Sequence, residues 1–214
     1  MQVITEVASY SQNTEQQVIL AAVGDRVGKF LDIGSYDGKW CSNTLALIER
    51  GWSGVLIEPA LEPFKNLLAN HGGNPKLTLI QAAVGPTRGL VEFWNAPSGV
   101  ATTDPKNVKK WGKQLPFDSP YFIPQLSVAD LLDKFPGHYD VVSIDTEGTS
   151  VAVFWASVRA MQSDMPQVWC VEHDGQEQAC VNAVGAGYEV VERNGENIVL
   201  ARREMSSYDH QYAK

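Results

Sequence analysis

The feature that most constrains the fold is a short apolar run that ends in a glycine-bearing turn, KFLDIGSYDG at residues 29–38. Residues 30–33 predict a strand that breaks at Gly34, and a helical pattern follows over residues 38–50. A strand, a turn and a helix in this order are typical of the edge at which an α/β sheet binds a nucleotide-like ligand. The chain is therefore expected to form an open, mostly parallel sheet with helices on its faces.

A second apolar segment, VLIEP at 55–59, ends in the carboxylate of Glu58. An acidic residue at the end of the second strand is placed to accept hydrogen bonds from the two ribose hydroxyls of an adenosine. The first turn has the pattern D-x-G-x-x-x-G and lacks the middle glycine that lets a backbone approach a pyrophosphate. Adenosine without a pyrophosphate predicts S-adenosyl-L-methionine as the cofactor.

Helix-like and strand-like segments alternate along nearly the whole chain. Helices are predicted over residues 13–27, 38–50, 61–70, 126–135, 149–162 and 176–186. Strands are predicted over residues 29–33, 53–57, 77–83, 90–94, 141–144 and 167–175. The alternation of apolar and polar residues in 90–94 is typical of an edge strand.

The last patterned segment, YEVVERNGENIVLARR at 188–203, predicts two strands around Asn194-Gly195. This dipeptide is typical of a type I′ hairpin turn. Strands joined by so short a turn must be antiparallel. A mostly parallel sheet that closes on an antiparallel hairpin is therefore expected.

The length of 214 residues suits one globular domain. We expect a helical segment over residues 1–28, the sheet-forming domain over 29–203 and a tail over 204–214. Residues 95–125 interrupt the alternation with several prolines and a run of lysines. An irregular insertion of this length is typical of a lid or a binding loop, and the alternative is a solvated surface loop.

The composition favours a protein of the cytoplasm. Hydrophobic residues make up 44% of the chain, and no apolar run approaches the roughly 20 residues of a membrane span. The N-terminus lacks the basic and apolar regions of a secretory signal, and three cysteines are too few for a disulfide framework. The net charge of −8 disfavours a protein that follows nucleic-acid backbones.

Acidic side chains follow two buried strands of the predicted sheet. Asp145 comes directly after residues 141–144, and Glu172 and Asp174 lie in VEHDG at 171–175. Because ligands bind outside the carboxyl ends of parallel strands, these groups are expected at one rim. Two explanations stay open. Asp145 with Glu172 or Asp174 binds a divalent cation such as Mg²⁺, or the carboxylates orient a substrate without a metal.

His173 lies between those carboxylates in the sequence. An imidazole has an unperturbed pKa of about 6.5, so this side chain is suited to accept a proton near neutrality as a general base. The alternative is a histidine that is only hydrogen-bonded at the end of a strand. Glu147 either joins the acidic rim or caps the helix predicted over 149–162.

Six short motifs follow one another along the chain: LDIGSYDG, VLIEP, QAAVG at 81–85, SIDTEG at 143–148, VEHDG and GYEVVERNGENIVLARR at 187–203. In this order they resemble the FkbM family of S-adenosylmethionine-dependent methyltransferases over residues 29–203. The resemblance implies the class I methyltransferase fold, a Rossmann-like seven-stranded sheet in the order 3-2-1-4-5-7-6, with strand 7 antiparallel and helices on both faces. It also implies O-methylation of hydroxyl groups on sugars, glycans, polyketides or other small acceptors.

The first turn is expected to hold the methionine end of the cofactor. Backbone N–H groups around Gly34, Ser35 and Gly38 can face its carboxylate. Asp32 is expected to accept from its ammonium group. The alternative is a turn that caps a helix and binds no ligand.

The other end of the cofactor is expected to be held by the next two strands. Glu58, followed by Pro59, is expected on the ribose hydroxyls. Ala82 and Ala83 either form a flat wall for the adenine or are packing residues. Asp145 is expected to contact the cofactor and to act in catalysis.

Two other functions are compatible with the same fold. A nucleic-acid methyltransferase would use Lys106, Lys109, Lys110 and Lys113 on phosphates, and the charge of −8 makes this the weaker hypothesis. A methyltransferase-like protein that binds a cofactor but transfers nothing is the other. The acidic rim beside the cofactor site argues against a protein that transfers nothing. Like charges repel one another, so a wholly structural explanation of the rim is awkward.

Overall fold

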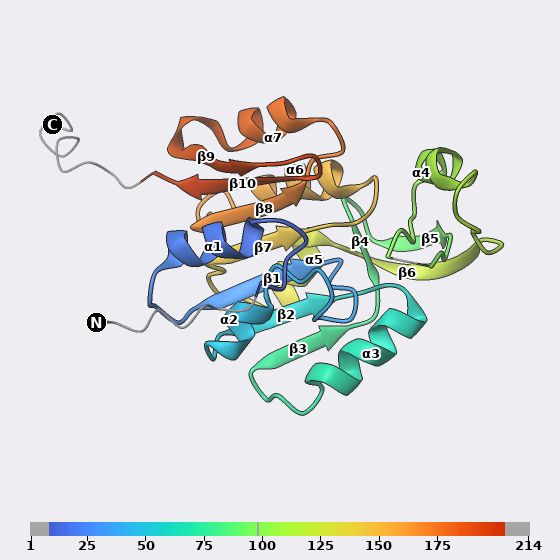
Figure 1. The fold of residues 1–214 in the computed structure, drawn as a ribbon, viewed down its shortest axis with the longest axis horizontal. Helices are drawn as coiled ribbons and strands as arrows, with labels where there is room; N and C mark the ends of the chain where they lie inside the picture. The colour runs from blue at the N-terminus through green and yellow to red at the C-terminus, as the bar shows by residue number, and fades with distance from the viewer. Residues whose placement is uncertain (1–8, 98, 204–214) are drawn as a thin grey trace, which may run out of the picture.

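A seven-stranded sheet forms the centre of the computed structural model, which describes residues 9–97 and 99–203 (Figure 1). In spatial order its strands are β3 (Leu77–Ile80), β2 (Ser53–Ile57), β1 (Lys29–Ile33), β7 (Val141–Ile144), β8 (Val168–Glu172), β10 (Asn197–Arg202) and β9 (Tyr188–Arg193). The first five run parallel, and β10 is antiparallel to both β8 and β9. The predicted order 3-2-1-4-5-7-6, with an antiparallel seventh strand, is therefore confirmed.

Helices cover both faces of this sheet. On one face lie α1 (Glu15–Val23), α2 (Leu45–Glu49) and α3 (Leu61–His71); on the other lie α5 (Val128–Lys134), α6 (Ser150–Ala160) and α7 (Glu177–Val184), which is followed by the short helix η1 (Gly185–Gly187). Phe30 packs into the core beneath α1, and Leu31 packs into the core beneath α6, because successive side chains of a strand point to opposite faces. The central strands are buried on both faces, which explains their continuous apolar runs.

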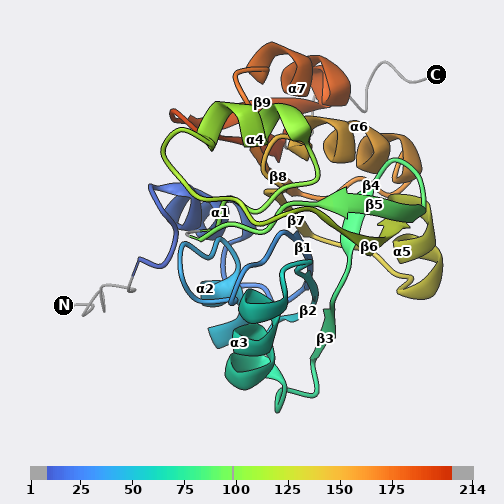
Figure 2. The same cartoon turned by 90° about the vertical axis from the view of Figure 1, so that its right-hand side faces the viewer.

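A second, smaller sheet lies beside the edge at which the parallel strands end (Figures 1 and 2). Its spatial order is β4 (Ala83–Gly85), β6 (Tyr121–Ser127) and β5 (Gly89–Phe93), and β5 pairs with β6 alone, as predicted for an edge strand. The strand predicted over 77–83 divides between the two sheets, since β3 ends at Ile80. The segment 95–125 is not irregular throughout, because it contains α4 (Pro105–Trp111) and much of β6.

The helix predicted over 38–50 is shorter in the structure. Asp37 Oδ1 accepts hydrogen bonds from the N–H groups of Lys39 and Trp40, at 2.8 and 2.7 Å. Ser42 Oγ accepts from the N–H of Leu45 at 3.0 Å. Side chains therefore bind the amide groups that a helix would use, and α2 begins only at Leu45.

The antiparallel hairpin is confirmed, but its turn is not of type I′. That type needs a positive φ at both central residues, and neither Asn194 nor Gly195 has one. Instead, Asn194 Oδ1 accepts from the N–H groups of Glu196 and Asn197, at 3.0 and 2.8 Å. The asparagine side chain thus builds the turn that the dipeptide was predicted to build with its backbone.

The N-terminal helix belongs to the same core as the sheet. Ile19 and Leu20 of α1 pack with Phe30 of β1 and Val199 of β10. The tail predicted over 204–214 lies outside the described residues. Within residues 9–97 and 99–203, no helix is both long enough and apolar enough to cross a bilayer.

Gly34 permits the closest approach between the turn after β1 and the chain after β7. Its φ is +87°, and a Cβ there would lie 1.6 Å from the carbonyl oxygen of Asp145. We expect Gly34→Ala to lower the free energy of unfolding by about 3 kcal/mol or more, because it adds backbone strain to a steric clash. Urea denaturation measures this loss.

Gly73→Ala is the matched control, because a Cβ at Gly73 would meet no atom within 4 Å and the backbone there has no positive φ. This variant should stay within about 0.5 kcal/mol of wild type. Equal stability of the two variants would contradict the close approach of the two segments.

Candidate functional site

A cavity of about 360 Å³ opens at the edge where the parallel strands end. Its lining comes from the loops after β1, β2, β7 and β8, from the turn between β9 and β10, and from the insertion between β5 and β6. The volume is in the range of small-ligand pockets, roughly 300–1,000 Å³. Its position agrees with the predicted site.

Backbone strain gathers around this cavity. Among the described residues, four other than glycine have a left-handed φ: Tyr36, Cys41 and Glu147 at 51° and Asp174 at 48°. All four line the cavity. Such conformations cost of order 1–3 kcal/mol each and cluster at functional sites, where the surrounding structure holds them. Strain and concavity therefore mark the same place.

Asp32 is held at the bottom of the first turn. Its side chain is buried, and its Oδ2 accepts from the hydroxyl of Thr44 at 2.6 Å. Burial raises the pKa of Asp32 to about 6, although hydrogen bonds from Thr44 and Ser143 lower it. A neighbouring cation would therefore readily convert this group to its charged form.

The backbone of the first turn is not available as predicted. The N–H groups of Gly34 and Ser35 both donate to the carbonyl of Ile57, at 2.9 and 3.0 Å. The N–H of Tyr36 donates to Glu58 Oε2 at 3.0 Å. These amides join the turn to the end of β2, and the N–H of Gly38 donates to the carbonyl of Ser35 at 2.9 Å. The prediction that the N–H groups of Gly34, Ser35 and Gly38 face a carboxylate of the cofactor is therefore wrong. Gly34 and Ser35 still line the cavity.

Glu58 connects two loops at the end of β2. Its Oε2 accepts from Tyr36 N, and its Oε1 accepts from Ala60 N at 2.7 Å. Burial raises the pKa of Glu58 to about 7 against the effect of these hydrogen bonds. Each carboxylate oxygen has a second lone pair, so the group can still accept from a ligand hydroxyl in the cavity that it lines together with Pro59.

The predicted adenine wall lines the cavity, whereas Gly38 does not. Ala82 and Ala83 are buried and lie in the lining. Gly38 has a φ of +71°, and a Cβ there would lie 2.6 Å from the ring of His71. The Gly38 carbonyl is 2.9 Å from His71 Nε2. Gly38 therefore serves the packing of the first turn against α3.

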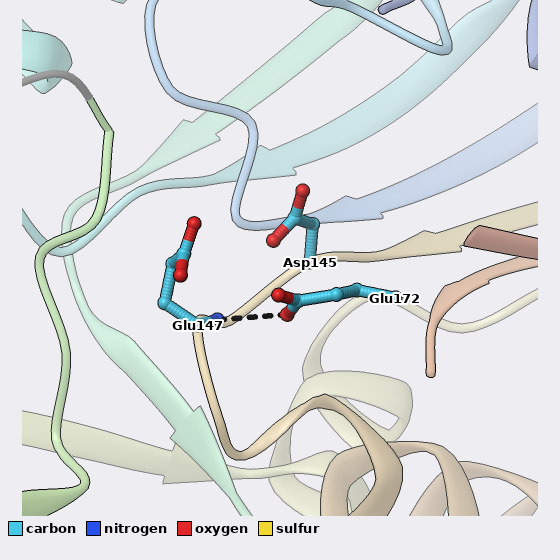
Figure 3. Close-up of side chains that lie close together, drawn as sticks. All are labelled: Asp145, Glu147 and Glu172. Carbon is cyan, nitrogen blue, oxygen red and sulfur yellow. Dashed lines mark hydrogen bonds between the residues drawn. The ribbon is translucent and has the colours of Figure 1, made fainter. Parts of the chain in front are cut away.

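Three carboxylates converge where β7 and β8 end (Figure 3). Asp145, Glu147 and Glu172 each place one oxygen atom within 4.8 Å of the others. Glu172 Oε2 accepts from the N–H of Glu147 at 3.1 Å and from the hydroxyl of Ser150 at 2.6 Å. We call these three residues the acidic cluster.

The charged form of the acidic cluster is unfavourable. Burial raises the pKa of Asp145, Glu147 and Glu172, and each is raised further by a neighbouring carboxylate. The cluster therefore favours a proton or a cation between its oxygen atoms. Oxygen ligands of this kind suit a hard cation such as Mg²⁺.

The structure changes the predicted set of metal ligands. It brings Asp145 and Glu172 together and adds Glu147, whereas Asp174 lies outside the group of three. Asp174 Oδ2 is buried and has no hydrogen-bond partner in the described part of the chain. Asp174 lines the same cavity, so it stays close to a bound ligand without belonging to the acidic cluster.

His173 does not face the cavity. Its Nδ1 accepts from the N–H of Gly175 at 3.0 Å, so the proton is assigned to Nε2, which donates to the carbonyl of Asn194 at 3.1 Å. The ring is 3% exposed and is not part of the lining. Both nitrogens are engaged by the backbone, and the prediction of His173 as general base is therefore not supported.

The insertion holds the acidic cluster from the other side. The hydroxyl of Thr102 donates to the carbonyl of Glu147 at 2.6 Å, and Asn107 Nδ2 donates to Glu147 Oε2 at 3.3 Å. Thr102 and Asn107 are both buried. Sequence patterns did not identify them, because polar residues in a segment rich in proline and lysine carry no periodic signal.

Comparison with known proteins agrees with this geometry. A model of the methyltransferase FkbM domain matches residues 32–180, which is more than half of the chain and extends from β1 into α7. The chain belongs to the FkbM methyltransferase family. No curated protein matches the chain.

Solved structures support the fold of this FkbM domain. The methyltransferase FkbM from Methylobacillus flagellatus KT is similar at 14% identity and a TM-score of 0.54, over 82% of this chain and 44% of that one. The Escherichia coli protein yhhF, which carries the name of a methyltransferase, is similar at 10% identity and a TM-score of 0.52, over 92% and 89% of the two chains. This chain spans less than half of the first protein, and identities this low show the fold alone.

The pKa of Glu147 makes stability depend on pH. Burial raises this pKa in the folded state, so protonated Glu147 stabilises the fold at pH values below the pKa that the residue has in the unfolded chain. This stabilisation is lost as the pH rises through the pKa of the folded state. Between about pH 5 and about pH 8, wild type should lose stability relative to Glu147→Gln, because the folded protein keeps a proton on Glu147 that the unfolded chain has released. The expected loss is about 1.4 kcal/mol for each pH unit. Urea denaturation at both pH values measures the gap.

The exposed Glu189 offers a matched control. Glu189→Gln should keep a constant difference from wild type at both pH values, because it removes a surface carboxylate outside the acidic cluster. A gap for Glu147→Gln that does not grow with pH would show that Glu147 ionises freely in the folded protein.

Proposed function

We propose that this FkbM domain transfers a methyl group from S-adenosyl-L-methionine to a hydroxyl group of a sugar, a glycan or another small acceptor. The charge of the cavity carries the proposal. Among the described residues, seven carboxylates line it against one basic side chain, that of Lys110; the seven are Asp32, Glu58, Asp145, Glu147, Glu172, Asp174 and Glu196. A cofactor with a sulfonium and an ammonium group suits such surroundings, whereas the pyrophosphate of a dinucleotide is repelled.

The residues of the cavity divide between the two ends of the cofactor. Glu58 and Pro59 would hold the ribose, and Ala82 and Ala83 would face the adenine. Asp32, on the next strand, would accept from the ammonium group of the methionine end. The cationic cofactor favours the charged forms of Asp32 and Glu58, whose pKa values burial raises to about 6 and about 7.

Methyl transfer is a displacement at a carbon that the sulfonium already activates. The protein must position the acceptor oxygen and assist the loss of its proton. Because both nitrogens of His173 are engaged, we assign the proton to the acidic cluster, with Asp145 as its acceptor. Burial raises the pKa of Asp145 to about 7, which suits a general base near neutrality.

Binding a divalent cation is the alternative role of the acidic cluster, because an ion bound to Asp145 would lower its pKa and take the place of the proton that it accepts as a base. The three oxygen atoms of the acidic cluster lie close enough to share one ion, and all are hard ligands. A bound Mg²⁺ supplies positive charge that lowers the pKa of a hydroxyl group in contact with it. Asp145, Glu147 and Glu172 would hold it, and Glu172 is oriented for this by Ser150 and the backbone of Glu147.

Nucleic acid fits this cavity less well. Lys106 and Lys109 on α4 and the neighbouring Lys113 are exposed, but Lys110 lies at a cavity lined mainly by carboxylates, which repel phosphates. A protein that binds the cofactor without transferring a methyl group does not explain the acidic cluster. Both functions therefore rank below transfer to a small acceptor.

We also propose a reducing compartment, the cytoplasm. Cys41, Cys170 and Cys180 are all free, and the last two are buried. Free cysteines without disulfides are typical of reducing surroundings.

Calorimetric titration tests the cofactor. S-adenosylhomocysteine should bind saturably, and Glu58→Ala should weaken it at least about tenfold, or about 1.4 kcal/mol, through loss of the ribose contact. Glu189→Ala, on the surface, should leave the affinity unchanged. Saturable binding of NAD without any response to S-adenosylhomocysteine would overturn the proposal. With a methyl-labelled donor and a mixture of small metabolites, the same protein should yield a labelled acceptor.

Thermal unfolding tests the cation. Mg²⁺ or Mn²⁺ should raise the Tm by mass action, because the acidic cluster exists only in the folded state. Asp145→Asn should abolish the rise while S-adenosylhomocysteine still binds. Asp174→Asn, outside the acidic cluster, should preserve it. If neither cation raises the Tm of the wild type, the acidic cluster binds no cation, and proton transfer is left as its role.

A further inference from the structure

Asn197 occupies a distinctive corner of the cavity. It is the first residue of β10, and because β10 runs antiparallel, its beginning lies at the edge where the parallel strands end. Asn197 pairs in register with Glu172 of the acidic cluster. Its side chain is 5% exposed and lines the cavity together with Gln12, Cys41 and Glu196. We call these four residues the hairpin corner.

The orientation of the Asn197 amide is determined by Glu15. Asn197 Nδ2 donates to Glu15 Oε1 at 3.0 Å, and Asn194 Nδ2 donates to the same oxygen at 2.7 Å. Glu15 is fully buried, and although burial raises its pKa, hydrogen bonds from the backbone and from the two asparagines outweigh burial and leave the pKa lowered. An ionised carboxylate can only accept, so the amide cannot be reversed.

Asn197 Oδ1 therefore faces away from Glu15. This atom is buried and has no hydrogen-bond partner among the described residues. A buried carbonyl oxygen without a partner costs about 1–3 kcal/mol, and a ligand that donates to it removes that cost. Because Asn197 lines the cavity, a ligand bound there can supply such a donor.

The charge around this corner favours a cationic donor. The thiol of Cys41 has its pKa raised by burial and then by Glu196, Asp145, Glu15 and Asp37, all of which are acidic. The basic residue of the lining, Lys110, belongs to α4 and lowers the pKa of Glu147 and Asp174 instead. An ammonium group satisfies both the acidic surroundings and the unpartnered oxygen.

The ammonium group of the cofactor is already assigned, to Asp32 on β1. Asn197 begins β10, three strand spacings away across β7 and β8. We therefore assign the donor at Asn197 to the second substrate.

We propose that the hairpin corner binds a protonated amine of the methyl acceptor, with Asn197 Oδ1 as the hydrogen-bond acceptor. The proposal rests on the proposed methyltransferase function and adds the chemical class of its substrate. The acceptor then carries an ammonium group beside the hydroxyl that is methylated. Asn197 binds the substrate, and Glu15 is a positioning residue that orients Asn197.

Matched pairs of small probes test this subsite in the full chain loaded with S-adenosylhomocysteine. The pairs are glucosamine with glucose and propylamine with propanol, titrated by ligand-observed NMR at a pH at which both amines are protonated. Within each pair the ammonium compound should bind at least about tenfold more tightly, as expected for one charge-assisted hydrogen bond. Asn197→Ala should remove this preference while S-adenosylhomocysteine still binds.

Two variants separate the subsite from the stability of the hairpin. Glu189→Gln removes an exposed carboxylate of β9 outside the lining, and it should keep the preference for ammonium. Glu196→Gln changes an exposed residue of the corner, and it should reduce the preference even if Asn197→Ala fails to fold. Equal binding within both pairs, no saturable binding of either amine, or an unchanged preference in Glu196→Gln would overturn the proposal. Binding of S-adenosylhomocysteine, measured on the same samples, reports separately on the proposed function.

Discussion

The burial of like charges at one edge of the sheet is the constraint on which the site depends. Asp145, Glu147 and Glu172 lie close together because β7 and β8 are adjacent and parallel, so the residues after them meet at one rim. Their pKa values are raised by burial and by one another. A protein under selection for stability alone would avoid this arrangement, since an unpaired buried charge costs several kcal/mol. Stability alone therefore does not explain why these carboxylates lie together.

The insertion between β5 and β6 contributes residues that hold the acidic cluster in place. The small sheet places α4 beside the ends of the parallel strands (Figure 2), where Thr102 and Asn107 bind Glu147. Glu147 has a left-handed backbone, and these contacts help to hold it there. The same cavity is bordered on its far side by the hairpin, where Glu15 of α1 orients Asn197. Elements from both ends of the chain thus close one site.

His173 lies where the sequence motif predicted it, at the end of β8, but the catalytic role predicted for it is not supported. The sequence places an imidazole, a group suited to accept a proton near neutrality, beside two carboxylates at the end of a buried strand. In the fold, the turn after β8 reverses so tightly that the ring accepts from Gly175 and donates to Asn194. The histidine joins the end of β8 to the hairpin, and the proton-accepting role is proposed for the carboxylates instead.

The strand order that the resemblance to the FkbM family implied is confirmed. The sequence by itself determined the strands, because the apolar runs of β1, β2 and β7 and the hairpin at Asn194 are local patterns. It also located Glu58 and Asp145, since the residue after a parallel strand lies at the binding edge. Only the tertiary structure decided which polar groups meet there. Asn197 and Glu15 are 182 residues apart, and Asn107 and Glu147 are 40 apart. No local pattern encodes such contacts, because they arise from packing that the whole chain determines.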